Sequence, residues 1–154
     1  MSEETIPETT QYLTFLLDRE VFAVDISRVR EVLDVVPITR VPRTPGYLSG
    51  IINLRGSVVP VADIRLKFGM PKAEKTVHSR IIILETAWDD DPVVLGALVD
   101  SVRAVLDLVQ DQIEPPPRIG TRVHREFIKG IGKHGNEFIS ILDIDKVFST
   151  MKKT

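Results

Sequence analysis

The sequence predicts an all-β protein with few short helices, built as two small five-stranded β-barrels that lie side by side. Short runs rich in β-branched residues dominate the 154-residue chain, and no stretch shows a long apolar stripe of helical period. In addition, two blocks of sequence recur in the same order in the second half of the chain. An internal duplication of one small β unit therefore accounts for the whole pattern.

Turn-forming residues bound each expected strand. The segments that read as strands are 12–17, 21–26, 56–64, 79–86, 93–99 and 137–144. Asp63 and Asp143 are candidate N-caps of two short helices over 64–69 and 144–149, and Gly69 is suited to end the first of them. The run 89–91 consists of three aspartates before a proline, which predicts the tip of a hairpin between two apolar strands.

The repeat consists of two pairs of aligned segments. Residues 29–36 align with 102–109 at six identical positions of eight, and residues 47–64 align with 127–144 at four of 18. Chance similarity between two strand–turn–strand units is the alternative, but the conserved order of both blocks favours duplication.

The repeat gives a first half over about 11–75 and a second half over about 76–150, with a flexible N-terminus at 1–10 and a tail at 151–154. Each half is small for an independent core, so we expect a shared apolar face between the halves and a groove at their junction.

Composition limits the classes of function. The formal net charge is −2 and the pI is about 5.9, so the chain lacks the basic field that holds nucleic acid. There is no cysteine, and the longest nearly apolar run, 93–99, is far too short to cross a bilayer. The start of the chain is acidic and polar, unlike a signal peptide. We therefore expect a soluble, cytoplasmic protein without direct membrane insertion.

Motifs for metal binding and catalysis are missing from the sequence. His78, His124 and His134 are 46 and 10 residues apart, whereas zinc ligands usually come in close pairs. The aspartate run 89–91 lacks the glycine and the distal glutamate of a calcium loop. No nucleophile elbow, phosphate loop or dinucleotide fingerprint occurs. We predict no catalytic residues, no metal site and no cofactor, although paired carboxylates of a hydrolase would leave no sequence motif.

Single-stranded nucleic acid is the alternative ligand, because small β-barrels often bind oligonucleotides. The tracts 40–43 and 118–125 are basic. Binding of this kind needs exposed aromatic residues, yet only 6% of the residues are aromatic. Phe15, Phe22 and Phe138 fall in strand patterns and read as core, which argues against this alternative.

The turn at Asn53–Gly56 differs between the two copies of the repeat. The first copy reads Asn-Leu-Arg-Gly and the second, at 133–136, reads Lys-His-Gly-Asn. A glycine is kept near the bend, as a positive φ requires, whereas Leu54 and Arg55 are not kept. An exposed leucine beside an arginine suits contact with a protein partner. The alternative is structural, in which Arg55 pairs with an acidic residue present only on its side of the molecule.

Several stretches resemble the CheW-like family of bacterial chemotaxis coupling proteins. They are FLLDREVFAVDISRVREVL, TPGYLSGIINLRGSVVPVADIRLKFG, VVLGALVDSVRAV and IKGIGKHGNEFISILDIDKV, and the resemblance covers about residues 11–150. It implies two SH3/OB-like five-stranded barrels with strands partly exchanged between the halves. The same domain occurs in the kinase CheA and in CheV, but 154 residues leave no room for a kinase or receiver domain, which favours the stand-alone coupling protein.

The resemblance further implies a non-catalytic adaptor that joins the cytoplasmic hairpin of chemotaxis receptors to the histidine kinase CheA in membrane receptor arrays. Carried over to this sequence, the receptor-binding positions are Val29, Glu31, Asn53, Leu54, Arg55 and Gly56. The kinase-binding positions, which rest on less specific motifs, are Gly96, Val99, Asp100 and Val102. No role is implied for the second turn at 133–136.

Overall fold

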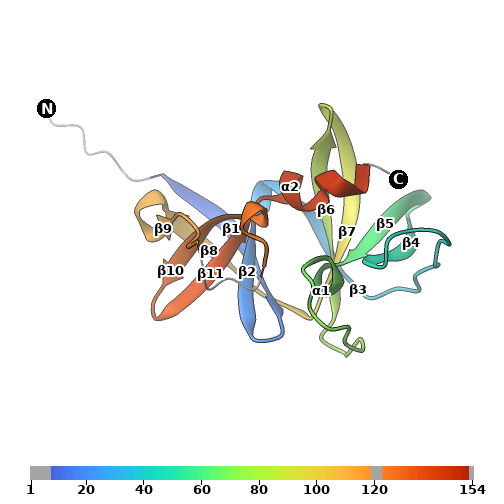
Figure 1. Cartoon of the computed structure of the whole chain (residues 1–154), viewed down its shortest axis with the longest axis horizontal. Helices are drawn as coiled ribbons and strands as arrows, with labels where there is room; N and C mark the ends of the chain where they lie inside the picture. Colours follow the sequence, from blue (N-terminus) through green and yellow to red (C-terminus); the bar gives the residue numbers. More distant parts are fainter. Residues whose placement is uncertain (1–7, 119–122, 153–154) are drawn as a thin grey trace, which may run out of the picture.

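The computed structural model of the chain describes residues 8–118 and 123–152. Strands and short helices form two β-sheets that lie side by side (Figure 1), as the sequence predicts. The strands are β1 (Thr9–Leu17), β2 (Glu20–Asp25), β3 (Val29–Asp34), β4 (Leu48–Leu54), β5 (Ser57–Asp63), β6 (Arg80–Trp88), β7 (Asp91–Val99), β8 (Ser101–Val109), β9 (Ile113–Glu114), β10 (Ile128–His134) and β11 (Glu137–Leu142). The α-helices are α1 (Ile64–Lys67) and α2 (Ile144–Phe148), and the 3₁₀ turns are η1 (Ile26–Arg28), η2 (Gln110–Gln112), η3 (Arg125–Phe127) and η4 (Ser149–Lys152).

Each sheet takes strands from both halves of the repeat. The first sheet has the order β8-β1-β2-β11-β10-β9, and the second has the order β3-β6-β7-β5-β4. The N-terminal hairpin β1–β2 therefore lies among strands that come after residue 100, while the β6–β7 hairpin completes the sheet formed by β3, β4 and β5. The first sheet has one strand more than the predicted five, because the two-residue β9 pairs with β10.

Both sheets are strongly curled. The outer strands β8 and β9 of the first sheet are joined only by the three-residue η2. Four Cα steps span at most about 15 Å, whereas the outer strands of a flat six-stranded sheet lie about 24 Å apart. The sheet must therefore bend until its edges approach each other. In the second sheet, Thr39 follows β3 closely and forms a β-bridge with Ile51 of β4, which brings those two edges together in the same way.

The repeated segments occupy equivalent places in the two sheets. β5 lies parallel to β7 with Val61 opposite Gly96, and β11 lies parallel to β2 with Ile141 opposite Ala23. Residues 61 and 141 are equivalent in the repeat, so Ala23 and Gly96 are equivalent as well. The outer strands β3 and β8 are also alike, because the pairing of each shows a register shift at an equivalent place.

The largest core cluster lies between the sheets. Alternate residues of β6 divide between two clusters: Ile82 and Leu84 face the first sheet, while Ile81 and Ile83 face the inside of their own curled sheet. The first sheet has its own inner cluster, which includes Leu108 and Ile139. Strands with two buried faces need apolar residues at every position, which explains the unbroken apolar run of β6. The predicted shared apolar face is thus the main core of the protein.

The two short helices begin as predicted. Asp63 accepts a hydrogen bond from the backbone N–H of Leu66 (3.3 Å), and Asp143 accepts one from the backbone N–H of Lys146 (3.2 Å).

Both chain ends are ordered over more residues than the sequence predicts. β1 already begins at Thr9, so the end of the expected flexible segment 1–10 is part of the first sheet. Met151, expected in a tail, is buried in the main core.

Two ion clusters connect the sheets at repeat-equivalent positions. Arg65, in the helix after β5, is 8% exposed and donates from Nη1 to Asp18 and Asp100, each at 2.6 Å. Asp145, in the helix after β11, accepts from both Nη atoms of Arg28 (2.8 and 2.7 Å) and from Oγ1 of Thr86 (2.7 Å). Residues 65 and 145 are equivalent in the repeat and opposite in charge, and each ties its helix to groups of both sheets.

We predict that Arg65→Met destabilises the protein by about 2–4 kcal/mol, because it leaves two neighbouring carboxylates without their cation. Urea unfolding followed by far-UV circular dichroism measures the change. The control is Asp34→Asn, whose side chain is 89% exposed and should matter little. A loss below about 1 kcal/mol for Arg65→Met would mean that the cluster does not hold the sheets together.

We also predict that Arg28→Gln has its largest effect at neutral pH. Its hydrogen bond lowers the pKa of Asp145, so the pair stabilises the folded state above the unfolded-state pKa of about 3.9. This contribution disappears as the pH falls through the lowered pKa of the folded protein. Melting temperatures of wild type and variant should therefore converge in acid. The control Arg30→Gln, which removes an exposed pair with Glu85, should change melting little at any pH; a constant difference for Arg28→Gln would contradict the assignment.

Candidate functional site

The turn between β4 and β5 consists of Arg55 and Gly56. Both residues have positive φ, +50° and +89°, as in a type I′ hairpin turn. Asn53 supports the turn, since its Oδ1 accepts the backbone N–H of Gly56 at 2.8 Å. Leu54 was expected to be exposed at the tip, but it is the last residue of β4 and packs, half-buried, against the inner cluster of the second sheet. Arg55 alone occupies the tip with the glycine.

The equivalent turn of the first sheet is built differently. It consists of Gly135 and Asn136, and of these only Gly135 has a positive φ, +62°. A non-glycine residue in the left-handed region costs about 1–2 kcal/mol, and asparagine or glycine would relieve that strain at position 55. The first turn keeps an arginine there nevertheless, which points to a role for its side chain.

That side chain pairs with Glu31 of β3. Arg55 Nη2 contacts Glu31 Oε2, and Nη1 lies 3.3 Å from Oε1. The arginine is 69% exposed and the glutamate 29%. The hydrogen bond from Arg55 lowers the pKa of Glu31. Glu31 is therefore the acidic partner that the structural alternative for Arg55 requires.

The pair joins opposite edges of the second sheet, because β3 and β4 are its outer strands. Its repeat-equivalent positions are Ala104 and Gly135, so the second copy lacks both partners. The first sheet instead has an ion pair between Arg103 of its outer strand β8 and Glu137 at the start of β11 (2.9 Å), which also spans the curl beside the hairpin. A cross-sheet ion pair therefore does not by itself require an arginine in the strained position 55.

Behind the pair lies a groove of about 610 Å³, named here the Arg55 groove. Its lining comes from five strands and one turn: Arg30 and Glu31 of β3, Leu54 of β4, Arg55, Ser57, Val58, Val59 and Pro60 of the β4–β5 turn and β5, Ile83 of β6, and Pro92, Val93 and Val94 of β7. Because β5 and β7 are parallel neighbours, the turns that precede them lie at the same end of the sheet, around the groove.

Val58 presents a large apolar side chain in this groove, at 70% exposure. Sequence reasoning missed it, because β5 is apolar on both faces and the pattern gives no sign of which valine is exposed. Of the predicted receptor-binding residues, Glu31, Leu54 and Arg55 line the groove together. Asn53 and Gly56 shape the turn, whereas Val29 packs against the main core and does not line the groove.

The predicted kinase-binding residues lie together around the end of β7 and the start of β8, but mostly inside the protein. A Cβ at Gly96 would lie 2.9 Å from Cγ2 of Ile81, so this glycine permits close packing. Val99 is buried in the main core, and Val102 packs against that core. Asp100 is committed to Arg65. Their assignment to kinase contact stays a prediction, and little of their surface is open to a partner.

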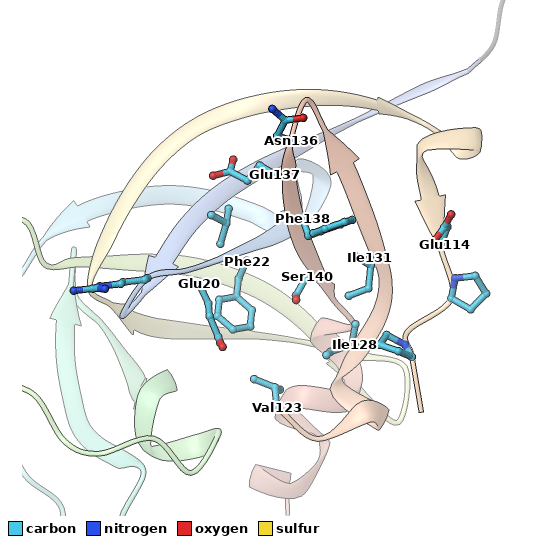
Figure 2. Close-up of a pocket in the computed structure, with 14 residues that line it drawn as sticks. Glu20, Phe22, Glu114, Val123, Ile128, Ile131, Asn136, Glu137, Phe138 and Ser140 are labelled. Carbon is cyan, nitrogen blue, oxygen red and sulfur yellow. The ribbon is translucent and has the colours of Figure 1, made fainter. Parts of the chain in front are cut away.

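A second groove, of about 680 Å³, lies on the first sheet and is named here the Phe138 groove (Figure 2). Phe138 was predicted to be core, but it is 67% exposed; Phe15 and Phe22 are buried as expected. Phe138 and Val58 are repeat-equivalent. The Phe138 groove is lined in part by β2 and the Arg55 groove by β7, and these two strands are also equivalent in the repeat. Figure 2 shows the Phe138 ring on β11 beside Ile131 of β10. Each sheet thus carries one of these two grooves.

Two observations bear on other classes of function. Within residues 8–118 and 123–152, no three histidine or acidic side chains gather in a way that would hold a metal ion. Over the same ranges, every helix is too short or too polar to span a membrane.

Comparison with known proteins gives concordant results. The CheW-like domain matches residues 11–152. The chemotaxis protein CheW of Klebsiella aerogenes is 31% identical over 97% of this chain and 87% of its own length. The chemotaxis protein CheW of Rhizobium meliloti is 33% identical over 93% of this chain and 90% of its own.

A solved structure agrees as well. The scaffolding protein TtCheW from Thermoanaerobacter tengcongensis superposes with a TM-score of 0.83 at 37% identity, covering 92% of this chain and 93% of that one. Fold, sequence and repeat architecture together show that this chain belongs to the CheW-like domain family.

Proposed function

We propose that this chain is a non-catalytic adaptor of bacterial chemotaxis, which couples the cytoplasmic hairpins of chemotaxis receptors to the histidine kinase CheA. The observation that carries the proposal is the Arg55 groove with its exposed, repeat-breaking arginine. The fold forms the equivalent hairpin without that arginine, so a partner is the better explanation for keeping it.

The architecture supports an adaptor over an oligonucleotide-binding barrel. Two repeat-related grooves on different sheets allow one chain to hold two partners at once. Relatives named as chemotaxis and scaffolding proteins support the same reading. Phe138 is an exposed aromatic, but the cations beside its groove, Lys133 and Arg103, are paired with Glu114 and Glu137, so the groove lacks the excess of positive charge that holds phosphates. The proposed location is the cytoplasm, at membrane receptor arrays.

We predict that Arg55→Glu weakens binding to a receptor cytoplasmic fragment at least about tenfold, since charge reversal at an interface costs more than one kcal/mol. Melting should change little, because the Arg55–Glu31 pair is solvent-exposed. Isothermal titration with the receptor fragment, and in parallel with CheA, measures the binding.

The matched control is the double variant Glu31→Arg/Arg55→Glu, which restores an ion pair with its charges exchanged. If the arginine acts on a partner, the double variant still binds poorly although its melting equals that of wild type. Recovery of binding in the double variant would show that only the closing of the sheet edges matters. Failure of the wild-type protein to bind either partner would overturn the proposed function.

A further inference from the structure

The β6–β7 hairpin is longer than its repeat counterpart. Counted from the equivalent residues Ala23 and Gly96, β2 begins three residues earlier and β7 begins five residues earlier. The β6–β7 hairpin therefore has two additional residue pairs, Ala87 with Pro92 and Trp88 with Asp91. We call residues 87–92 the hairpin extension; Figure 1 shows this end of β6 and β7 projecting beyond the rest of the sheet.

The extension borders the Arg55 groove. Pro92 lines that groove and also lines a smaller polar cleft of about 320 Å³, which is formed with Ser27, Arg28 and Asp90. The two hollows therefore adjoin at Pro92, and together they are called the depression here. The β4–β5 turn stands at one end of this depression and the hairpin extension at the other.

The two ends carry opposite charge. At the first end Arg55 is paired with Glu31, but its guanidinium is 69% exposed and remains accessible to a partner. The turn of the extension contains Asp89 and Asp90, both with positive φ, and Asp91 follows at the start of β7. Between these ends lie the apolar side chains of Val58, Pro92 and Val93. The equivalent run at the β1–β2 turn is Asp18–Arg19–Glu20, in which the arginine reduces the formal net charge to −1, compared with −3 for Asp89–Asp91.

We propose that this depression binds its partner in one direction only: an amphipathic segment of the receptor with a carboxylate toward Arg55, apolar side chains on Val58 and Pro92, and a cation toward Asp89–Asp91. This inference rests on the proposed function. Complementary charges at two ends of one apolar surface favour one orientation and disfavour the reverse, in which like charges face each other. The hairpin extension thereby sets partner orientation, a task that the shorter β1–β2 hairpin does not perform in the first sheet.

Neutralisation of the acidic end tests the proposal. The variant Asp89→Asn/Asp90→Asn/Asp91→Asn keeps the turn, because asparagine tolerates positive φ. Binding to the receptor cytoplasmic fragment should weaken roughly fivefold, as expected for losing exposed charge contacts, and should depend less on salt. Asp107→Asn is the matched control, an exposed aspartate on β8 of the other sheet. Unchanged affinity and salt dependence in the triple variant would overturn the proposal.

A second measurement reads the orientation directly. A photocrosslinking residue is placed either at Val58 or at Asp90, and the crosslinked sites on the receptor fragment are mapped by mass spectrometry. The proposal expects two separate sites, the one from position 90 next to lysine or arginine and the one from position 58 nearer to aspartate or glutamate. Overlapping or reversed sites would reject a fixed orientation. Arg55→Glu separates the two hypotheses. If the crosslinked sites reject a fixed orientation but Arg55→Glu still weakens receptor binding about tenfold, the orientation proposal fails and the proposed function stands.

Discussion

The exchange of hairpins between the two sheets is the constraint on which the rest of the structure depends. β1 and β2 complete a sheet whose other strands follow residue 100, and β6 and β7 complete the sheet of β3, β4 and β5. The exchanged strands present apolar residues to both sides, so the main core lies between the sheets, where neither half of the chain could form it alone. The aromatic contacts repeat this arrangement. Phe22 of β2 packs against Phe68, the residue that follows α1 in the chain, and Phe68 stacks on Phe127 of η3.

Polar groups fix how the two sheets align with each other, because apolar packing alone does not specify that alignment. Apolar contact is non-directional, whereas the hydrogen bonds of Arg65 and Asp145 specify which helix meets which turn. Opposite charges at the two equivalent positions also prevent either cluster from accepting the other's partners. A duplicated chain faces the risk of pairing its copies in the wrong combination, and this difference in charge is one physical means of avoiding it.

Local signals were predictable from the sequence, and long-range ones were not. The capping roles of Asp63 and Asp143 could be predicted, because a cap is a hydrogen bond to a backbone N–H only three residues further along the chain. The parallel pairing of β2 with β11 joins residues more than 100 positions apart, and no local pattern specifies it. Phe138 was misassigned because alternation shows that a residue faces one side of a strand without showing whether that side is covered. Glu31 and Arg55 were named through the family resemblance, but their direct contact follows only from the curl of the sheet that brings β3 to β4.

The exchange also orders events during synthesis of the chain. The β1–β2 hairpin emerges from the ribosome first, yet its neighbours β8 and β11 are made only after every strand of the second sheet. Until then, Phe15, Leu17 and Phe22 lack the part of the main core that residues 123–151 contribute, and an isolated two-stranded hairpin is barely stable in water. The second sheet, in contrast, has all of its strands once β7 has been translated. The nascent protein thus passes through a stage with one sheet assembled and an apolar N-terminal hairpin uncovered, the kind of species that chaperones bind.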